Sequence, residues 1–119
     1  MKADRPGEFI CFCPITLPTK EGDAHTFFSI DAFSGFLMNT GSELTDDAET
    51  ILKHIYLLTE HPEFKKKSEK GYTLVLHDYH DLAARIKSII EPYGKILFDK
   101  DYHEEVSTPV IESLFSRFK

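Results

Sequence analysis

The sequence predicts an α/β fold: a mixed five-stranded sheet flanked by helices, in the order β-β-β-α-β-α-β-α. Two observations carry this prediction. Three apolar, strand-like segments follow one another in the first third of the chain, and the rest alternates helix-like apolar spacing with short apolar runs. A meander of strands followed by alternating helices and strands is typical of a sheet that carries helices on its faces. Parallel strands in the second part would be joined by right-handed crossovers.

The first three strands are expected at residues 8–17, 25–32 and 35–40. Each is rich in apolar or aromatic residues, and residues 33–35 supply a tight turn between the last two. Three strands this close in sequence predict an antiparallel meander. Pro14 lies in the middle of the first strand, and because proline has no amide donor we expect an edge, a bulge or a break there.

Two helices are expected in the middle of the chain. Thr45 is expected to cap the first, whose apolar residues recur three and four positions apart and end near Pro62. Residues 63–71, which include three successive lysines, are expected to form a solvated loop. The second helix covers about residues 81–90, and Pro92 ends it.

Two short strands and a last helix complete the expected order. The strands cover residues 72–77 and 95–98, and a polar loop is expected over residues 99–108. The last helix is expected to start near Pro109. Proline is favourable in the first turn of a helix, because its missing amide donor is not needed there.

The length of the chain favours one domain, residues 1–119, with one hydrophobic core. No run approaches the ~18 apolar residues that a membrane span needs, and residues 1–6 contain no apolar segment of the signal-peptide type. Cys11 and Cys13 lie two positions apart on one expected strand, and we expect them to be reduced core thiols. These features predict a cytoplasmic protein that does not use a membrane.

The acidic balance of the chain limits its partners. Aspartate and glutamate number 20 against 14 lysine and arginine residues, which gives a formal net charge of −6. A free-standing nucleic-acid-binding domain is usually basic, since much of its affinity comes from contacts with phosphates. We therefore expect at most weak DNA binding by this chain on its own, through a local basic patch.

Five segments, in chain order, point to a known family. They are Arg5–Glu8, Ile15–Gly22, Phe28–Phe36, Leu76–Asp78 and Ile111–Lys119. These segments resemble motifs of the catalytic core of retroviral-type integrases and of bacterial insertion-sequence transposases, the DDE (rve) family. The likeness runs nearly end to end, and five motifs in the family's order are far more specific than any one of them. The resemblance implies a ribonuclease H-like fold, a link to DNA integration, and Mg²⁺ or Mn²⁺ as the cofactor of an active member.

The resemblance implies that Asp78 and Glu112 are two of the family's three catalytic carboxylates. Thirty-three residues separate them, which is close to the family's usual spacing. A carboxylate at a strand end paired with another at a helix start is how many phosphoryl-transfer enzymes hold Mg²⁺. Asp78 and Glu112 are therefore the expected metal ligands. The ligand-rich run from His77 to Asp81 also allows a transition-metal site, although a strand end followed by a helix cap is the favoured interpretation.

The first catalytic aspartate of the family is missing from this chain. It would stand directly before Ile15, where the chain has Cys13-Pro14, and neither residue supplies the hard oxygen that Mg²⁺ prefers. Asp31, on the neighbouring strand, is a candidate substitute if its strand pairs near position 14. The alternative is that Asp31 hydrogen-bonds the turn that follows it. Two of the three carboxylates remain, so we expect a degenerate active site.

The family also suggests DNA contacts near the end of the chain. Lys119 lies two helical turns after Glu112 on the same face, where the family places a DNA-facing lysine, and Arg117 lies beside it. Lys65–Lys67 could contact DNA as well, although a solvated loop is the favoured interpretation there. Because the helix that carries Glu112 usually continues in the family, the chain is expected to be either a fragment truncated at its C-terminus or a small decayed or repurposed domain.

Three functions remain open on this sequence. The first is an integrase-like domain with a degenerate active site, kept for self-association or for binding a transposase partner. The second is an active Mg²⁺-dependent DNA nuclease or strand transferase that uses Asp31, Asp78 and Glu112. The third is a small regulatory or structural protein with no link to nucleic acid. The acidic charge favours the first and the third.

Overall fold

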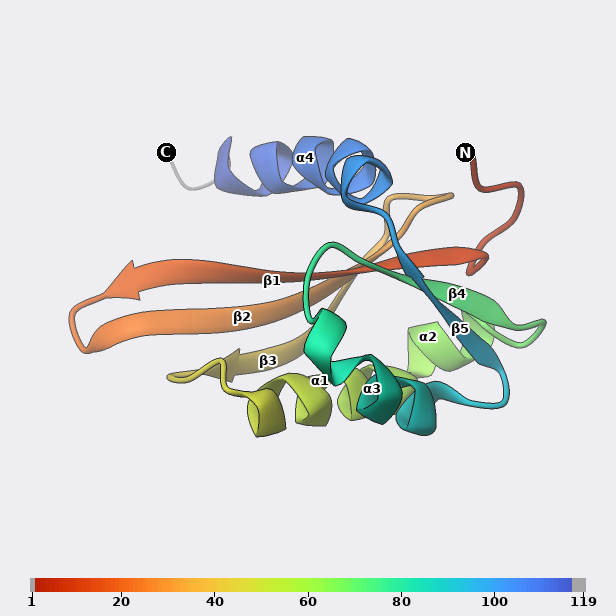
Figure 1. Cartoon of the computed structure of the whole chain (residues 1–119). Helices are drawn as coiled ribbons and strands as arrows, with labels where there is room; N and C mark the ends of the chain where they lie inside the picture. Colours follow the sequence, from red (N-terminus) through yellow and green to blue (C-terminus); the bar gives the residue numbers. More distant parts are fainter. Residues whose placement is uncertain (1, 117–119) are drawn as a thin grey trace.

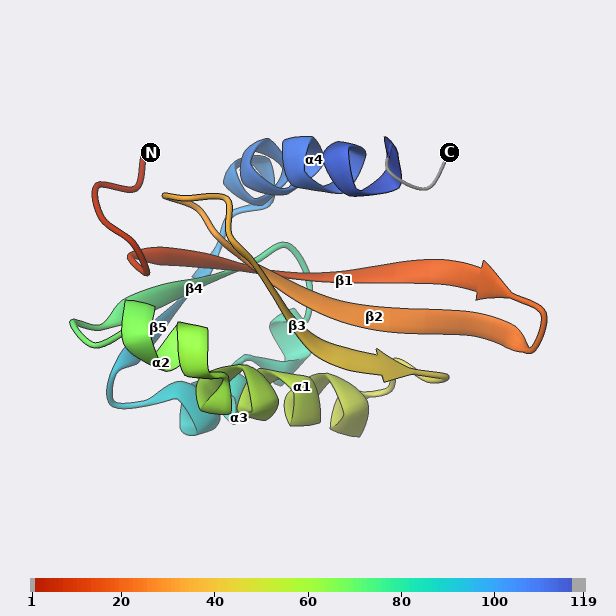
Figure 2. The ribbon, with the colours of Figure 1, turned by 180° about the vertical axis from the view of Figure 1, so that it is seen from behind.

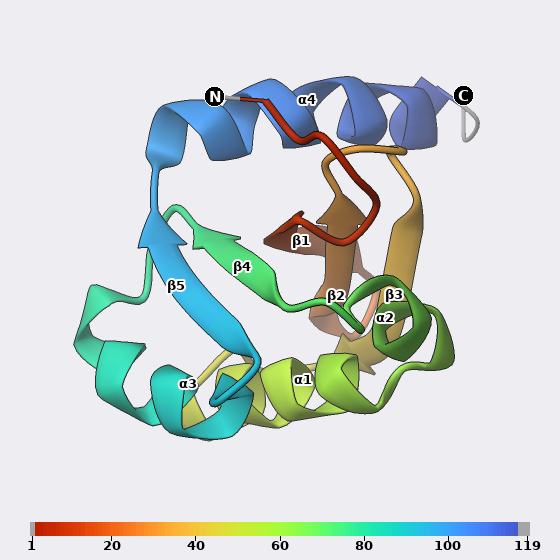
Figure 3. The same ribbon diagram turned by 90° about the vertical axis from the view of Figure 1, so that its right-hand side faces the viewer.

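A five-stranded sheet in the order β3-β2-β1-β4-β5 forms the centre of the protein. The computed structural model describes residues 2–116. The strands are β1 (Phe9–Thr19), β2 (Gly22–Asp31), β3 (Leu37–Glu43), β4 (Tyr72–Leu76) and β5 (Gly94–Phe98). The helices are α1 (Ala48–Glu60), α2 (Pro62–Lys67), α3 (Ala83–Ile90) and α4 (Lys100–Ser116), with a 3₁₀ turn, η1, at His80–Leu82. Helices α1, α2 and α3 lie on one side of the sheet and α4 lies on the other (Figure 1, Figure 3).

The sheet is mixed, as the sequence predicts. Strands β1, β2 and β3 are antiparallel neighbours, whereas β4 and β5 run parallel to β1. Strand β4 pairs only with Phe9–Cys11 of β1, so the remainder of β1 continues with β2 as a long hairpin away from β4 and β5. This hairpin and β3 form the extended end of the molecule in Figure 2.

Alternation along the strands divides the core into two layers. Even-numbered residues of β1 and β4, such as Phe12 and Leu74, face the layer beneath α1, α2 and α3. Odd-numbered residues, such as Cys13 and Val75, face the layer beneath α4. Each fully buried aliphatic or aromatic side chain contributes about 1.5–3 kcal/mol to folding. Both cysteines are free and buried, which confirms the prediction of reduced core thiols.

Pro14 causes neither a bulge nor a break, because β1 pairs with β2 in one register from Ile10 to Thr19. The direction of its main-chain groups explains this. The Glu8 carbonyl accepts a bond from a β4 amide, so the polar groups of even-numbered β1 residues point toward the β4 side. Pairing with β4 ends at Cys11, and the donor that Pro14 lacks would face an open edge. Of the three expected alternatives, the edge is the one observed.

The predicted polar loop over residues 99–108 is wrong, because α4 begins at Lys100. Asp99 caps this helix: its Oδ1 accepts a bond from the Tyr102 amide at 3.0 Å. Tyr102 and His103 are buried, and so is Ser107 one turn further along the helix. These buried side chains hold the first turns of α4 against the sheet. Pro109 lies inside the helix rather than at its start, at an exposed position where water can reach the carbonyl that it leaves unbonded.

Two further local predictions need correction. Asp47 rather than Thr45 caps α1, because the Asp47 side chain accepts the amide bond of the residue three positions on. The segment expected as a solvated loop over residues 63–71 begins with the short helix α2. Phe64 explains this helix: it is 2% exposed and packs edge-on against Tyr72, with ring centroids 4.7 Å apart. One buried aromatic residue among lysines produces no periodic apolar pattern, so the sequence did not indicate a helix here.

Candidate functional site

The C-terminal end of β4 is where the resemblance places an active site. Asp78 is the second residue after β4 and is exposed. Strand β1 lies beside this end of β4, and the first turns of α4 lie over both strands, as the contacts of His103 below show. The predicted position of Asp78 at a strand end is therefore observed. Its Oδ1 accepts a bond from the Tyr79 amide at 2.7 Å, so part of the carboxylate holds the turn.

Tyr79 carries backbone strain at this edge. Its φ of 72° lies in the left-handed region, which costs a non-glycine residue about 1 kcal/mol or more. The ring offsets that cost by packing against Phe12, with centroids 6.3 Å apart. Burial raises the pKa of the Tyr79 hydroxyl to about 12, and the nearby Asp78 charge acts in the same direction. The hydroxyl is therefore neutral at pH 7, and the packing of the ring adds to the Asp78 hydrogen bond in holding the turn.

Cys13, rather than Pro14, faces α4 at the position of the missing first carboxylate. Odd-numbered residues of β1 point to the α4 layer, so the Pro14 ring points to the other face. Ser107 of α4 is the polar side chain that acts on the Cys13 thiol. Burial raises the pKa of Cys13 to about 11, and the influence of Ser107 offsets part of that rise. A neutral thiol is a poor ligand for Mg²⁺.

Glu112 lies on the outer side of α4. It is exposed, whereas His103, nine residues earlier, is 3% exposed and faces the sheet. Nine residues of an α-helix rotate about 180° and rise about 14 Å. Glu112 therefore points away from the sheet, well along the helix from its first turns. The structure does not bring Glu112 and Asp78 together.

Asp31 lies at the end of β2, opposite Ile10 rather than Pro14, which pairs with Phe27. Ile10 in turn pairs with Leu74 of β4, four residues before Asp78. Four strand residues span about 13 Å, so Asp31 lies far short of the end of β4 along the sheet. The register that would have put Asp31 near position 14 does not occur.

Asp31 is instead the centre of a buried network, with no exposed surface of its own. Its Oδ1 accepts bonds from the amides of Gly7 (3.0 Å) and Phe33 (3.3 Å). Its Oδ2 accepts the Ser34 hydroxyl at 2.8 Å and lies 3.5 Å from Lys67 Nζ. One carboxylate thus ties together the N-terminal segment, the β2–β3 turn and α2. Of the two alternatives expected for Asp31, a substitute catalytic carboxylate or a residue that hydrogen-bonds the following turn, the hydrogen bonds to the turn are observed.

His103 is the residue that sequence reasoning missed at this edge. Its Nε2 donates to the Phe12 carbonyl at 2.8 Å. This carbonyl points toward the β4 side of β1 but lies beyond the last residue of β1 that pairs with β4. The His103 ring lies 4.5 Å from that of His77. Burial lowers the pKa of His103, so the ring is neutral at pH 7. The helical spacing of Tyr102, His103 and Ser107 is the one sequence signal of a buried helix face here. It was not recognised because these residues were expected to form a loop.

The groups at this edge do not form a metal cluster. Across residues 2–116, no three His, Cys, Asp or Glu side chains are arranged to hold a metal ion. Asp78 is nevertheless exposed at the place where the family would hold one, so metal binding by Asp78 and Glu112 stays a prediction. Arg117 and Lys119, the predicted DNA contacts, lie outside the described residues.

Comparisons with known proteins identify the fold. No protein-family model and no curated protein matches the sequence. A solved structure does match: a chain in the cryoEM structure of the simian T-cell lymphotropic virus intasome in complex with PP2A regulatory subunit B56 gamma, with a TM-score of 0.68 and 8% identity. The match covers 99% of this chain and 43% of that chain. The part of the chain that the structure describes contains no helix long and apolar enough to cross a membrane. The chain has the ribonuclease H-like fold of the integrase catalytic core.

Proposed function

We propose that this chain is an integrase-core-like domain related to DNA integration that acts through association rather than catalysis. Its partner would be a second copy or another integrase-fold chain such as a transposase. The fold and the order of motifs support the link to integration. The arrangement of side chains at the C-terminal end of β4 supports the loss of chemistry.

The outward position of Glu112 carries this proposal. Two-metal phosphoryl transfer needs carboxylates gathered around ions about 3.5–4 Å apart. Here Asp78 is exposed beside β1, Glu112 points away from the sheet, and the position facing α4 on β1 holds the neutral Cys13 thiol. A catalytic arrangement would require α4 to rotate by about half a turn. That rotation would expose Tyr102 and His103, which are 7% and 3% exposed.

The exposed Asp78 favours one alternative, a Mg²⁺-dependent nuclease or strand transferase. In that reaction an activated water or a DNA 3′-hydroxyl attacks a phosphodiester in line, with Asp31, Asp78 and Glu112 as metal ligands. Asp31 would have to leave three hydrogen bonds and one ion pair. Each buried bond that is broken without replacement costs about 1–3 kcal/mol. The alternative therefore demands a large rearrangement of this structure.

A Mn²⁺ titration monitored by backbone amide broadening separates the two functions. The samples are the wild type, Asp78→Ala, and Asp23→Ala as a matched exposed carboxylate on the β1–β2 hairpin. We expect weak broadening that is no stronger near Asp78 and Glu112 than near Asp23. Selective broadening near Asp31, Asp78 and Glu112 that disappears only in Asp78→Ala, together with Mn²⁺-dependent cleavage of DNA, would overturn the proposal in favour of the nuclease.

The association itself is tested by light scattering after size exclusion, over a wide range of concentration. A mass that rises toward that of a dimer supports self-association. A strictly monomeric chain leaves the transposase partner, which is tested by adding a catalytically complete integrase-fold transposase in excess. A monomer that also fails to bind such a chain contradicts the proposed function.

A further inference from the structure

Three adjoining hollows surround the start of β4, at the opposite end of the strand from Asp78. Their volumes are about 460, 360 and 550 Å³, and Glu69 lines all three. The first and third hollows also share Tyr72 and Tyr93, and the second and third share Arg5 and Lys70. Because they share these lining residues, the three hollows are neighbours, and we call them together the β4 furrow. Its two parts differ in chemistry.

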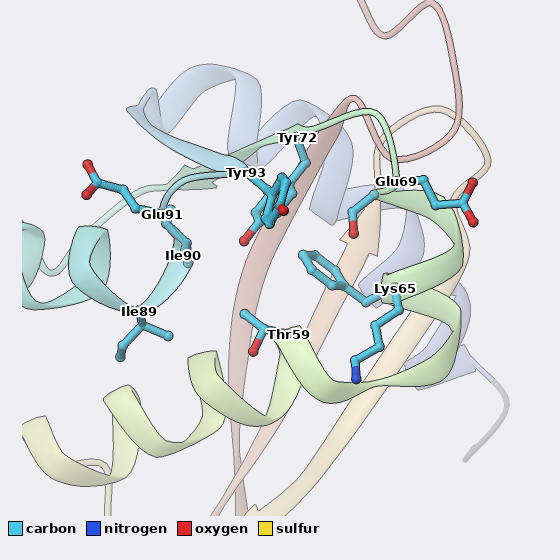
Figure 4. A pocket seen from close by; sticks show the side chains of 10 residues that line it. Thr59, Lys65, Glu69, Tyr72, Ile89, Ile90, Glu91 and Tyr93 are labelled. Carbon is cyan, nitrogen blue, oxygen red and sulfur yellow. The ribbon is translucent and has the colours of Figure 1, made fainter.

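One part of the β4 furrow is aromatic and apolar. Phe64, Tyr72 and Ile90 form its buried walls, and Tyr93 lies at its mouth with 72% of its surface exposed. Figure 4 shows the side chains around this hollow, with the charged ends of Glu69 and Glu91 pointing away from it. An exposed aromatic ring beside an apolar hollow is suited to receive a flat aromatic group.

The aromatic part is fixed by close backbone contacts. The Tyr72 ring lies directly over Gly94: a Cβ on that glycine would stand 2.5 Å from the ring. The Tyr72 amide donates to the Tyr93 carbonyl at 3.2 Å, which holds the Tyr93 backbone beside the start of β4. The Tyr72 ring and the Tyr93 backbone are therefore held in place by the fold, and binding would not have to order this part of the hollow.

The other part of the β4 furrow is basic. Its lining includes Arg5, Lys66, Lys70 and Lys95, and the Arg5 guanidinium is held by a bond from Nη2 to the Gly71 carbonyl at 3.2 Å. Among residues 2–116, no carboxylate lies within ion-pair distance of these four side chains, whereas Lys65 and Lys67 are paired. These unpaired charges are available to an anion.

The local charge is opposite to that of the chain. Apart from Lys67, which pairs with Asp31, the two basic hollows are lined by four basic and three acidic side chains, whereas acidic residues outnumber basic ones in the sequence as a whole, 20 to 14. Three of the lining lysines, Lys66, Lys70 and Lys95, are exposed. This end of β4 is therefore more favourable to an anion than the net charge of the chain would suggest.

We propose that the β4 furrow binds a nucleotide unit, with the base against Tyr93 in the aromatic hollow and the phosphate among Arg5, Lys70 and Lys95. The juxtaposition of a fixed aromatic hollow with unpaired cations is the chemistry that recognises a base joined to a phosphate. Such a unit occurs as a free mononucleotide or within a single strand of nucleic acid. The proposal does not depend on the proposed function, since it uses none of the residues at the other end of β4.

The test is an NMR titration of the whole chain with four probes: inorganic phosphate, thymidine, thymidine 5′-monophosphate and a single-stranded thymidine oligonucleotide. We expect saturable shifts of the Gly71, Tyr93 and Lys95 amides with the two nucleotide probes, at concentrations where phosphate or thymidine alone gives little change. Tighter binding of the oligonucleotide identifies a strand as the source, and equal or tighter binding of the monophosphate identifies a free nucleotide.

Variants assign each part of the furrow. Tyr93→Ala should weaken nucleotide binding about tenfold, because stacking is lost at an exposed position that does not support the fold. Lys70→Glu should weaken nucleotide binding more than Tyr93→Ala does. Glu69→Gln should strengthen nucleotide binding, because it removes the charge of the carboxylate that all three hollows share. Lys20→Glu, on the exposed hairpin turn, is the matched control for charge.

Two results would overturn the proposal. One is the absence of saturable shifts at the β4 furrow with either nucleotide probe. The other is binding that Lys20→Glu weakens as much as Lys70→Glu does, because that would mean a non-specific charge effect.

Discussion

The two ends of β4 differ in what their polar groups do. At the C-terminal end the polar groups are engaged within the protein: His103 donates to the Phe12 carbonyl, Asp78 accepts from the following amide, and the Cys13 thiol is buried and neutral. At the N-terminal end, lysines without ion-pair partners among the described residues lie beside an exposed tyrosine. At the end that resembles a known active site, the polar groups therefore stabilise the fold rather than remain free for a ligand. The side chains that remain free for a ligand lie at the other end.

The largest expected effect concerns Asp31, whose carboxylate is fully buried in a network of hydrogen bonds rather than free to bind a metal ion. Asp31→Ala should lower the free energy of unfolding by about 3–5 kcal/mol, since it leaves Lys67 half-buried without its partner and removes three hydrogen bonds. Urea unfolding followed by circular dichroism measures this, with Asp23→Ala as the control within about 0.5 kcal/mol. A small loss for Asp31→Ala would break the structural assignment.

The next largest effect concerns the thiols beneath α4. Burial raises the pKa of Cys11 to about 12 and that of Cys13 to about 11. At pH 8 the folded chain should therefore react with a disulfide reagent at least about 100-fold more slowly than the urea-unfolded chain. Rapid labelling of the folded protein would mean that the C-terminal end of β4 is open and reactive. That result would contradict the description of this end as closed and engaged within the protein.

These positions also indicate what could be predicted from sequence. The order of strands and helices followed from apolar periodicity, because each element buries one face. The face of Cys13 could not be deduced, since it depends on the register of β1 against β2 and β4. The partners of Asp31 lie up to 36 residues away and leave no local pattern. The start of α4 was missed because Pro109 is a strong helix-start signal, whereas Asp99 is a weaker one among several polar residues.

A smaller effect is expected in the pH dependence of stability. Burial, with a contribution from His77, holds the pKa of His103 below the ordinary value of 6.5. Above that value both folded and unfolded chains are neutral at this residue, so it adds no pH dependence. As the pH falls below about 6.5 the unfolded chain takes up the proton first, and stability falls by up to about 1.4 kcal/mol per pH unit.

Unfolding of the wild type and His103→Gln at a series of pH values checks this. The variant keeps a side-chain donor near Phe12 but cannot titrate, so the part of the slope due to His103 should disappear. An unchanged slope would mean that His103 is not held neutral by the packing of α4 on β1.

The smallest expected effect lies at the N-terminal end of β4. Tyr93→Ala and Lys70→Glu should each change the free energy of unfolding by less than about 0.5 kcal/mol, because both side chains are exposed and contribute little packing. Thermal or urea unfolding provides the measurement. A loss of more than about 1 kcal/mol would mean that these residues stabilise the fold and would remove the contrast between the two ends.

One measurement tests this contrast most directly: a single isotope-labelled sample titrated with Mn²⁺ and, separately, with thymidine 5′-monophosphate. We predict that the nucleotide shifts the amides of Gly71, Tyr93 and Lys95, and that Mn²⁺ produces no selective broadening at Asp78 or Glu112. Selective broadening at Asp78 and Glu112, with no nucleotide response at the start of β4, would contradict the account at both ends.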